Sequence, residues 1–281
     1  MSLKQGALNS VIKLLKTGIG ILGGDRATRI SAQLAAGIAP TVIQQTEFGG
    51  IEFFCPAEIP EWYARNLLTK EPETIEWINT FSDEDVFWDI GANVGLYSLY
   101  AALRNIAVMS FEPSSGNYYL LNRNIEINKM DNRVFALCLA FNDTTRLDSF
   151  YMVNSALGGA FSSFAEAIDW KGNPFIASFK QAMIGFSIDD FVRQFDPLFP
   201  NHIKIDVDGI ENKIIRGAKN TLSDKRVKSI LIEMDSGRET YCSEMVHAIE
   251  EAGMKFVKKE HAQIVDNTEY SDCYNYIFVR F

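Results

Sequence analysis

Short apolar runs alternate with amphipathic segments from Asp85 to the end of the chain. The apolar runs lie at residues 86–90, 106–111, 134–141, 202–207 and 229–234. Apolar residues at helical spacing follow every run except the third. Nearly continuous apolar strands separated by amphipathic helices are typical of a parallel sheet that is covered on both faces. We therefore predict an α/β fold with a doubly wound, mostly parallel sheet.

The ends of this pattern predict further elements. The last two apolar runs, 255–259 and 274–280, have no helix between them, which predicts an antiparallel terminal strand. Residues 144–186 interrupt the alternation and are expected to form an insertion. Ser187 and Asp190 have the spacing of a helix cap. We expect an N-terminal helical and irregular segment at 1–80 and the main domain at 81–281.

The N-terminal segment carries apolar residues at helical spacing. These are Leu8, Val11, Ile12, Leu15, Ile19 and Leu22. Lys13 and Lys16 interrupt the apolar stretch, so it is expected to be neither a secretory signal nor a membrane span. The helix could pack on the rest of the protein, or its apolar face could rest on a membrane surface or a partner.

Polar residues follow each predicted central strand. Ligands of open α/β sheets bind beyond the carboxyl ends of the strands, so these residues are expected to share one site. They are Asp89 with the turn Gly91-Ala-Asn93-Val-Gly95, then Glu112, then Asn142 and Asp143, and finally Asp206 and Asp208.

The turn after the first strand indicates the kind of ligand. Gly91 and Gly95 let the backbone approach a ligand closely, and Glu112 can accept hydrogen bonds from ribose hydroxyls. The spacing differs from the dinucleotide pattern G-x-G-x-x-G, and Asp89 would repel a pyrophosphate. An adenosyl sulfonium such as S-adenosylmethionine therefore fits better than a nicotinamide cofactor. A purely structural turn is the remaining alternative.

Composition narrows the class of partner. Of the 281 residues, 47% are hydrophobic and 22% charged, as in an ordinary globular protein, and the net charge is −9. A chain that grips phosphate backbones normally shows a basic balance, so no nucleic-acid partner is expected. The four cysteines form no C-x-x-C pair, which suits a reducing, cytoplasmic location.

Several ordered motifs resemble those of the FkbM-type methyltransferases. They are Asp89-Ile-Gly-Ala-Asn-Val-Gly-Leu-Tyr-Ser98, Phe111-Glu-Pro113, Ser187-Ile-Asp-Asp190, Lys204-Ile-Asp-Val-Asp-Gly-Ile-Glu211, Ile214-Ile-Arg-Gly-Ala-Lys219 and Ile232-Glu-Met-Asp235. The resemblance covers roughly residues 50 to 280. It implies a class I methyltransferase fold, S-adenosylmethionine as methyl donor, and hydroxyl acceptors, often on sugars or other bacterial metabolites.

The resemblance also implies roles for single residues. Asp89, Gly91, Asn93 and Gly95 would form the cofactor turn, Glu112 would hold the ribose, and Asn142 or Asp143 would lie near the adenine. Asp206 would face the methionine end of the cofactor. Asp208 departs from the family, in which Glu is more usual, and the shorter side chain reduces the reach of this second acid.

Methyl transfer needs positioning and a base that accepts the hydroxyl proton. The local candidates for the base are Asp206, Asp208, Glu211 and His202. Lys204 could instead pair with Asp208 or Glu211.

Other roles stay open. Glu233 and Asp235 could join Asp206 around Mg²⁺, although we predict no metal site. Aromatic residues of the insertion could stack on a substrate or form the core of the insertion; they are Phe161, Phe164, Trp170 and Phe175.

We predict an S-adenosylmethionine-dependent O-methyltransferase that acts on a sugar or a related bacterial metabolite, as in polysaccharide biosynthesis. The alternatives are an NAD-dependent oxidoreductase and a non-catalytic, cofactor-binding assembly protein. The sequence does not determine the acceptor or the oligomeric state.

Overall fold

The computed structural model describes residues 3–281 and divides the chain into two compact units at Pro40. The first unit contains α1 (Leu3–Ile21) and α2 (Gly24–Gly37). The second unit, from Thr41 onward, contains all the strands. The boundary therefore falls at residue 40, not near residue 80 as predicted, because segments 41–54 and 58–79 pack into the core of the α/β unit.

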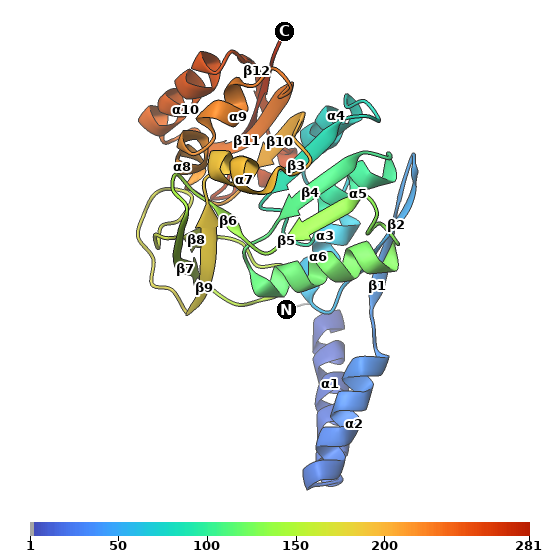
Figure 1. Ribbon diagram of the computed structural model, residues 1–281. Coiled ribbons are helices and arrows are strands. Elements are labelled where there is room, and N and C mark those ends of the chain that lie inside the picture. The colour runs from blue at the N-terminus through green and yellow to red at the C-terminus, as the bar shows by residue number, and fades with distance from the viewer. Residues whose placement is uncertain (1–2) are drawn as a thin grey trace. The chain divides into compact units, whose positions relative to one another are not determined.

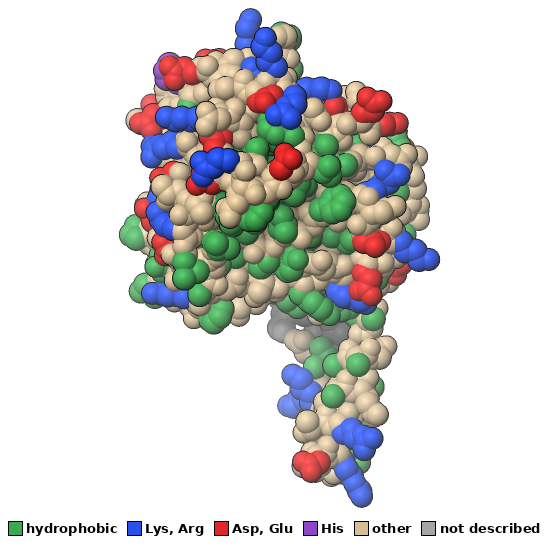
Figure 2. Space-filling model, viewed as in Figure 1, with side chains coloured by type: hydrophobic (Ala, Val, Ile, Leu, Met, Phe, Trp, Pro, Cys, Tyr) green, Lys and Arg blue, Asp and Glu red, His purple; other side chains and the backbone are tan. Residues whose placement is uncertain are grey.

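Several large apolar side chains of the first unit are exposed among those that the structure describes. Val11, Ile12, Leu14 and Leu15 are 41–72% exposed, and no residue of α2 is buried. Residues 1–40 carry five Lys and Arg against one acid, and Figure 2 shows basic side chains on the surface of this helix pair. Across the described residues, no helix has the length and apolar character needed to cross a membrane.

The second unit is built on a seven-stranded sheet with the order β12-β13-β11-β10-β3-β4-β5. Its strands are β3 (Val86–Ile90), β4 (Ala107–Phe111), β5 (Val134–Leu137), β10 (His202–Ile205), β11 (Ser229–Asp235), β12 (Lys255–Glu260) and β13 (Cys273–Val279). The five central strands are parallel, and β13 runs antiparallel to both of its neighbours. The predicted sheet is confirmed, including its antiparallel strand.

Helices cover both faces of this sheet (Figure 1). They are α3 (Glu58–Arg65), α4 (Pro72–Asn79), α5 (Leu96–Leu103), α6 (Ser115–Ile127), α7 (Ile188–Phe195), α8 (Glu211–Arg216), α9 (Lys219–Ser223) and α10 (Glu239–Glu251). Side chains alternate between the faces of a strand. Phe87 of β3 therefore packs in the core beneath α4–α6, whereas its neighbour Trp88 packs in the core beneath α7–α10.

The insertion forms a second sheet with the order β6-β9-β7-β8. Its strands are β6 (Ala140–Phe141), β7 (Arg146–Met152), β8 (Ser163–Phe164) and β9 (Phe179–Phe186). The apolar run 134–141 was predicted as one strand, but the chain leaves the main sheet after Leu137, and β6 pairs with β9 instead. The hairpin β1 (Thr41–Thr46) and β2 (Gly49–Phe54) and the short helix η1 (Gln263–Val265) complete the unit.

Replacement of Ser187 tests the predicted helix cap. The Ser187 hydroxyl accepts a hydrogen bond from the Asp190 amide at 3.1 Å, which confirms the cap of α7. Ser187→Ala should lower the free energy of unfolding by about 1 kcal/mol, measured by urea denaturation. Ser243→Ala, on the exposed face of α10, is the matched control and should have little effect. Equal stability of the two variants would show that the cap contributes nothing.

Candidate active site

The turn after β3 lies against the tip of β10. Gly91 has φ 86°, and a Cβ atom on it would lie 1.8 Å from the carbonyl oxygen of Asp206. The amides of Gly91 and Ala92 both donate to the Phe111 carbonyl at the end of β4, at 2.9 and 3.1 Å. Only glycine fits at this position. The turn therefore joins the tips of β3, β4 and β10 at the point where the strand order reverses.

Glu112 lies directly after β4 and faces the same turn. Its two carboxylate oxygens accept hydrogen bonds from the amides of Asn93 at 2.8 Å and Ser114 at 2.7 Å. The side chain is buried, and burial raises the pKa of Glu112 to about 7. Each oxygen keeps a lone pair for a further donor. The carboxyl group can therefore accept hydrogen bonds from the vicinal hydroxyls of a ribose.

A cavity of about 330 Å³ opens at the carboxyl ends of the strands. Its volume is within the range of small-molecule sites. Apolar side chains from the segment after β5, from β6 and from the insertion line one part of it, and these are Leu139, Phe141, Phe150, Met152 and Phe164. Charged side chains near the tips of β10 and β11 line another part. The cavity thus offers an apolar region for a planar ring beside a strongly polar region.

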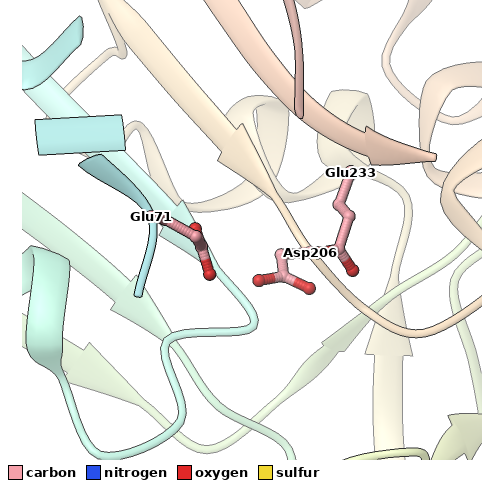
Figure 3. A group of neighbouring side chains, drawn as sticks. All are labelled: Glu71, Asp206 and Glu233. Atoms are coloured by element: carbon pink, nitrogen blue, oxygen red, sulfur yellow. The ribbon is translucent and has the colours of Figure 1, made fainter. Parts of the chain in front are cut away.

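A buried group of charges forms the polar region. The Lys204 ammonium lies 2.6 Å from Asp206 and 3.9 Å from Glu71, and Lys70 pairs with Glu71. Carboxylate oxygens of Glu71, Asp206 and Glu233 lie within 4.8 Å of one another, and Figure 3 shows Asp206 between the two glutamates. Burial alone would lower the pKa of Lys204, but the carboxylates of Asp206 and Glu71 raise it.

Glu233 is the acid of this group without a paired lysine. Lys204 forms ion pairs with Asp206 and Glu71, and Lys70 with Glu71. Burial, together with the charges of Asp206 and Glu71, raises the pKa of Glu233 well above its ordinary value. Glu71, Asp206 and Glu233 are the residues that could hold a divalent cation. The predicted alternative used Asp235, but that side chain accepts a bond from the Gly237 amide at 2.8 Å and is not part of the group.

The insertion covers the cavity. Asp208 accepts a hydrogen bond from the Phe161 amide at 2.6 Å, and the Phe161 ring stacks on Tyr270 at 5.3 Å between centroids. Trp170 packs beside both rings. Phe164 lies in the core beneath the insertion and also lines the cavity. Phe164 thus serves both as core of the insertion and as a wall of the cavity, Phe161 lines the cavity, and Trp170 and Phe175 do not line it.

The structure brings some of the predicted site residues together and separates others. Gly91, Asn93, Glu112, Asp206 and Asp208 line the cavity. Five others do not, namely Asp89, Gly95, Asn142, Asp143 and Glu211.

Asp89 lies behind the turn. It accepts a hydrogen bond from the Ser98 hydroxyl, and burial raises its pKa. Asn142 is fully buried because the chain turns out of the main sheet before it, and Leu139, Ala140 and Phe141 face the cavity instead.

Three other possibilities that the sequence left open for β10 and the helix after it are corrected. His202 lies at the opposite end of β10, where it contacts Asp85 at 3.0 Å and Ser229 at 2.7 Å, so it is no candidate base. Glu211 is bound by the Gly209 amide at 2.9 Å and by the Tyr241 hydroxyl. Lys204 pairs with Asp206 and Glu71. The sequence had suggested Asp208 or Glu211 as its partner instead.

Sequence reasoning missed residues from both ends of the α/β unit. Tyr63, Lys70 and Glu71 come from the segment before α4, and His261, Tyr270, Cys273 and Asn275 come from the last hairpin. The adjacent pair Lys70-Glu71 before a proline was a weak signal, because such pairs usually lie on the surface. The hairpin residues gave no signal, since their position depends on strand pairing.

Comparison with known proteins identifies the family. The model described as the methyltransferase FkbM domain matches residues 89–256, which is more than half of the chain. The chain belongs to the FkbM methyltransferase family. The FkbM match begins at Asp89 near the end of β3 and extends into β12, so it spans Glu112, Asp206, Asp208 and Glu233. The predicted family, the class I fold and the cofactor S-adenosylmethionine are confirmed. The alternative of an NAD-dependent oxidoreductase is therefore rejected in favour of a methyltransferase.

A curated relative and several solved structures are similar to this FkbM chain. Hexuronic acid methyltransferase AglP of Haloferax volcanii is 23% identical over 176 residues, which cover 63% of this chain and 66% of that protein. The match therefore spans slightly less than two thirds of the relative. A precorrin-6y C5,15-methyltransferase from Geobacter metallireducens aligns with 15% identity and a TM-score of 0.43, covering 77% of this chain and 91% of that one.

A tRNA (uracil-54, C5)-methyltransferase from Pyrococcus abyssi, solved with S-adenosyl-L-homocysteine, aligns with 9% identity and a TM-score of 0.47. The alignment covers 85% of this FkbM chain and 44% of that one.

The cavity of this FkbM protein fits S-adenosylmethionine. The Gly91 turn presents backbone without a side chain to the cavity, and Glu112 suits the ribose. Among the residues described, the buried Tyr97 hydroxyl has no hydrogen-bond partner, and Tyr97 lines the polar region. The acids there exceed the lysines, which suits the ammonium and sulfonium of the cofactor.

Replacement of Glu112 tests the ribose site. Glu112→Gln removes the charge that strengthens hydrogen bonds from the ribose hydroxyls, so S-adenosylhomocysteine should bind about 10- to 100-fold more weakly. Isothermal titration calorimetry measures the change. Glu126→Gln, an exposed residue of α6, is the control and should bind like the parent protein. Equal affinities for the two variants would remove Glu112 from the site.

The buried acids predict a pH dependence of stability in the absence of cofactor. The pKa values of Glu112 and Asp208 are both raised to about 7, and burial is the largest cause of each shift. Between about pH 4 and 7 the folded chain therefore holds more protons than the unfolded chain, and these two groups lower stability as the pH rises. Asp208→Asn should reduce that loss by roughly 1–3 kcal/mol, measured by urea denaturation across this range. Parallel curves for parent and variant would contradict the assignment.

Proposed function

We propose that the chain transfers a methyl group from S-adenosylmethionine to a hydroxyl of a sugar or a related hydroxylated metabolite. One observation carries this proposal: a single cavity joins the Gly91 turn and Glu112 to the acidic tips of β10 and β11. The name of the relative from Haloferax volcanii, a hexuronic acid methyltransferase, supports a sugar acceptor.

Positioning is the main task of the protein residues. S-adenosylmethionine supplies an already activated methyl group on its sulfonium. The Gly91 turn and Glu112 would hold the nucleoside, and the apolar region at Phe141 and Phe164 would receive the adenine. The Lys204–Asp206 pair fixes the tip of β10. Rate acceleration then comes from holding the acceptor oxygen in line with the methyl group and the sulfur.

Asp208 is the proposed general base. It lines the cavity, and burial together with Asp206 raises its pKa to about 7, close to the pH at which a base works best. Its backbone has φ 61°, an uncommon conformation that occurs at functional sites. Asp206 is less suited as the base, because its carboxylate forms an ion pair with the Lys204 ammonium at 2.6 Å. Glu211 does not line the cavity.

The negative charge of the protein and of its cavity supports the expectation that nucleic acid is not the acceptor. The net charge is −9, and the cavity wall contains more acids than lysines, so a phosphate backbone would be repelled. All four cysteines are free, which supports a reducing compartment such as the cytoplasm.

A transfer assay tests the proposal. The full chain is incubated with S-adenosylmethionine labelled in the methyl group and with a panel of methyl glycosides, and the label is counted in the sugar fraction. Label that enters at least one glycoside supports the proposal. Binding of S-adenosylhomocysteine without transfer to any glycoside would favour the non-catalytic alternative.

Replacement of Asp208 tests the base. Asp208→Asn keeps an oxygen for the Phe161 amide but cannot accept the proton, so kcat should fall about 10²- to 10⁴-fold. Affinity for S-adenosylhomocysteine should change only a few-fold. Asp131→Asn, in the exposed turn before β5, is the control and should leave kcat unchanged. An unchanged kcat and an unchanged pH–rate profile in Asp208→Asn would exclude this role.

A further inference from the structure

The strand order separates the residues that line the cavity into two sets, which we name the donor half and the acceptor half after the proposed function. The Gly91 turn, Glu112 and the apolar region lie at β3, β4 and β5, on one side of the reversal point. The other side lies at β10, β11 and β13. The residues that line this side include Tyr63, Glu233, His261, Tyr270, Cys273 and Asn275.

Strand pairing places the last hairpin at this side of the cavity. β13 is antiparallel to β11, with Asn275 opposite Glu233 and Cys273 opposite Asp235. The N-terminal end of β13 therefore lies at the carboxyl end of β11. The loop between β12 and β13 carries Tyr270, whose ring stacks on Phe161 of the insertion. The acceptor half is thus enclosed by residues from three separate parts of the chain.

The charges around this half are predominantly acidic. Among residues 3–281, the acids that line the cavity are Glu71, Glu73, Glu112, Asp206, Asp208 and Glu233. The Lys and Arg residues that line it are Lys70 and Lys204, and both form ion pairs with Glu71 or Asp206. No arginine of the described chain lines the cavity. A negatively charged acceptor would therefore find no lysine or arginine free of an ion pair among the described residues that line the cavity.

Two neighbouring side chains of the acceptor half, Asn275 and Glu233, present hydrogen-bond acceptors to the cavity. The Asn275 side chain is 3% exposed, and its amide nitrogen donates to Glu73 at 2.8 Å. Its carbonyl oxygen has no partner among the residues described, and the neighbouring strand presents Glu233. Hydroxyl groups can donate to both of these residues, whereas a carboxylate can only accept.

We propose that the acceptor half selects an uncharged sugar and excludes acceptors that carry a carboxylate, with Glu233 as the residue that sets this selectivity. This inference rests on the proposed function and adds the class of acceptor. It separates this chain from the relative named for a hexuronic acid.

The physical cause is the cost of a buried charge without a partner. A uronate carboxylate would lose its water on entering the cavity and would face Glu233 and Asp206. A neutral hydroxymethyl group in the same place loses less hydration and can donate a hydrogen bond.

A paired panel of acceptors tests the inference. The parent protein is assayed for transfer to methyl glucoside and methyl galactoside, and to their uronic counterparts, methyl glucuronide and methyl galacturonide. Each uronic acid differs from its partner only at carbon 6. The neutral sugar should show a kcat/KM at least about tenfold higher in one pair or both, the effect expected of one uncompensated charge.

Two variants assign the selectivity to Glu233. Glu233→Gln keeps the size of the side chain and removes its charge, so the ratio of neutral to uronic kcat/KM should fall about tenfold. Glu250→Gln makes the same charge change at an exposed position of α10 and should keep the parent ratio. Titration with S-adenosylhomocysteine checks that both variants still bind the donor product.

A divalent cation provides the opposing case. Mg²⁺ held by Glu71, Asp206 and Glu233 would offer a uronate the missing positive partner. The panel is therefore repeated with Mg²⁺ and with a chelator, and the ratio is expected to stay the same in both.

The outcomes separate the inference from the proposed function. Faster transfer to the uronic acids, with or without Mg²⁺, would overturn the inference while the proposed sugar methylation stands. An unchanged ratio in Glu233→Gln would overturn the assignment of this residue. Binding of the donor product without transfer to any of the four sugars, or to any other glycoside, would overturn the proposed function and the inference together.

Discussion

The close approach of the Gly91 backbone to the tip of β10 determines the rest of the site. A side chain at this position would collide with the Asp206 carbonyl. The turn after β3 can therefore lie against the end of β10 only if residue 91 is glycine. The same turn is bound to the end of β4 through the Phe111 carbonyl. Three strand tips therefore meet at one point, and the side chains that follow them, Glu112 and Asp206, reach a common cavity.

Charge balance gives this cavity its chemical character. Lys70 and Lys204 pair with two of the acids, and the other acids that line the cavity have no lysine or arginine partner among the described residues. This arrangement explains why burial raises the pKa values of Glu112, Asp208 and Glu233 in the free protein. The destabilised acids prepare the site for a cationic donor, and the same excess acts against an anionic acceptor. Donor affinity and acceptor selectivity thus have one electrostatic origin.

Much of this was readable from local patterns. The alternation of apolar runs and amphipathic segments predicted the parallel sheet and its antiparallel strand, because burial on two faces requires that pattern. The Gly91 turn and Glu112 were recognisable because a glycine turn and a strand-end acid act through their own backbone and side chain. The position of Asn142 was predicted wrongly because the apolar run 134–141 has the pattern of one strand. In the structure this run divides between two sheets.

Only the tertiary structure decided which distant residues complete the site. Lys70 and Glu71 meet Lys204 and Asp206 through packing of the segment before α4, and Asn275 meets Glu233 through antiparallel pairing. Long-range pairing depends on the register of whole strands, which no short motif encodes. The sequence by itself therefore determined the fold class and the donor half of the cavity, whose residues follow their strands directly. The acceptor half depends on contacts between distant segments. Glu71 and Lys204 are about 130 residues apart in the sequence, and Glu233 and Asn275 are about 40 residues apart.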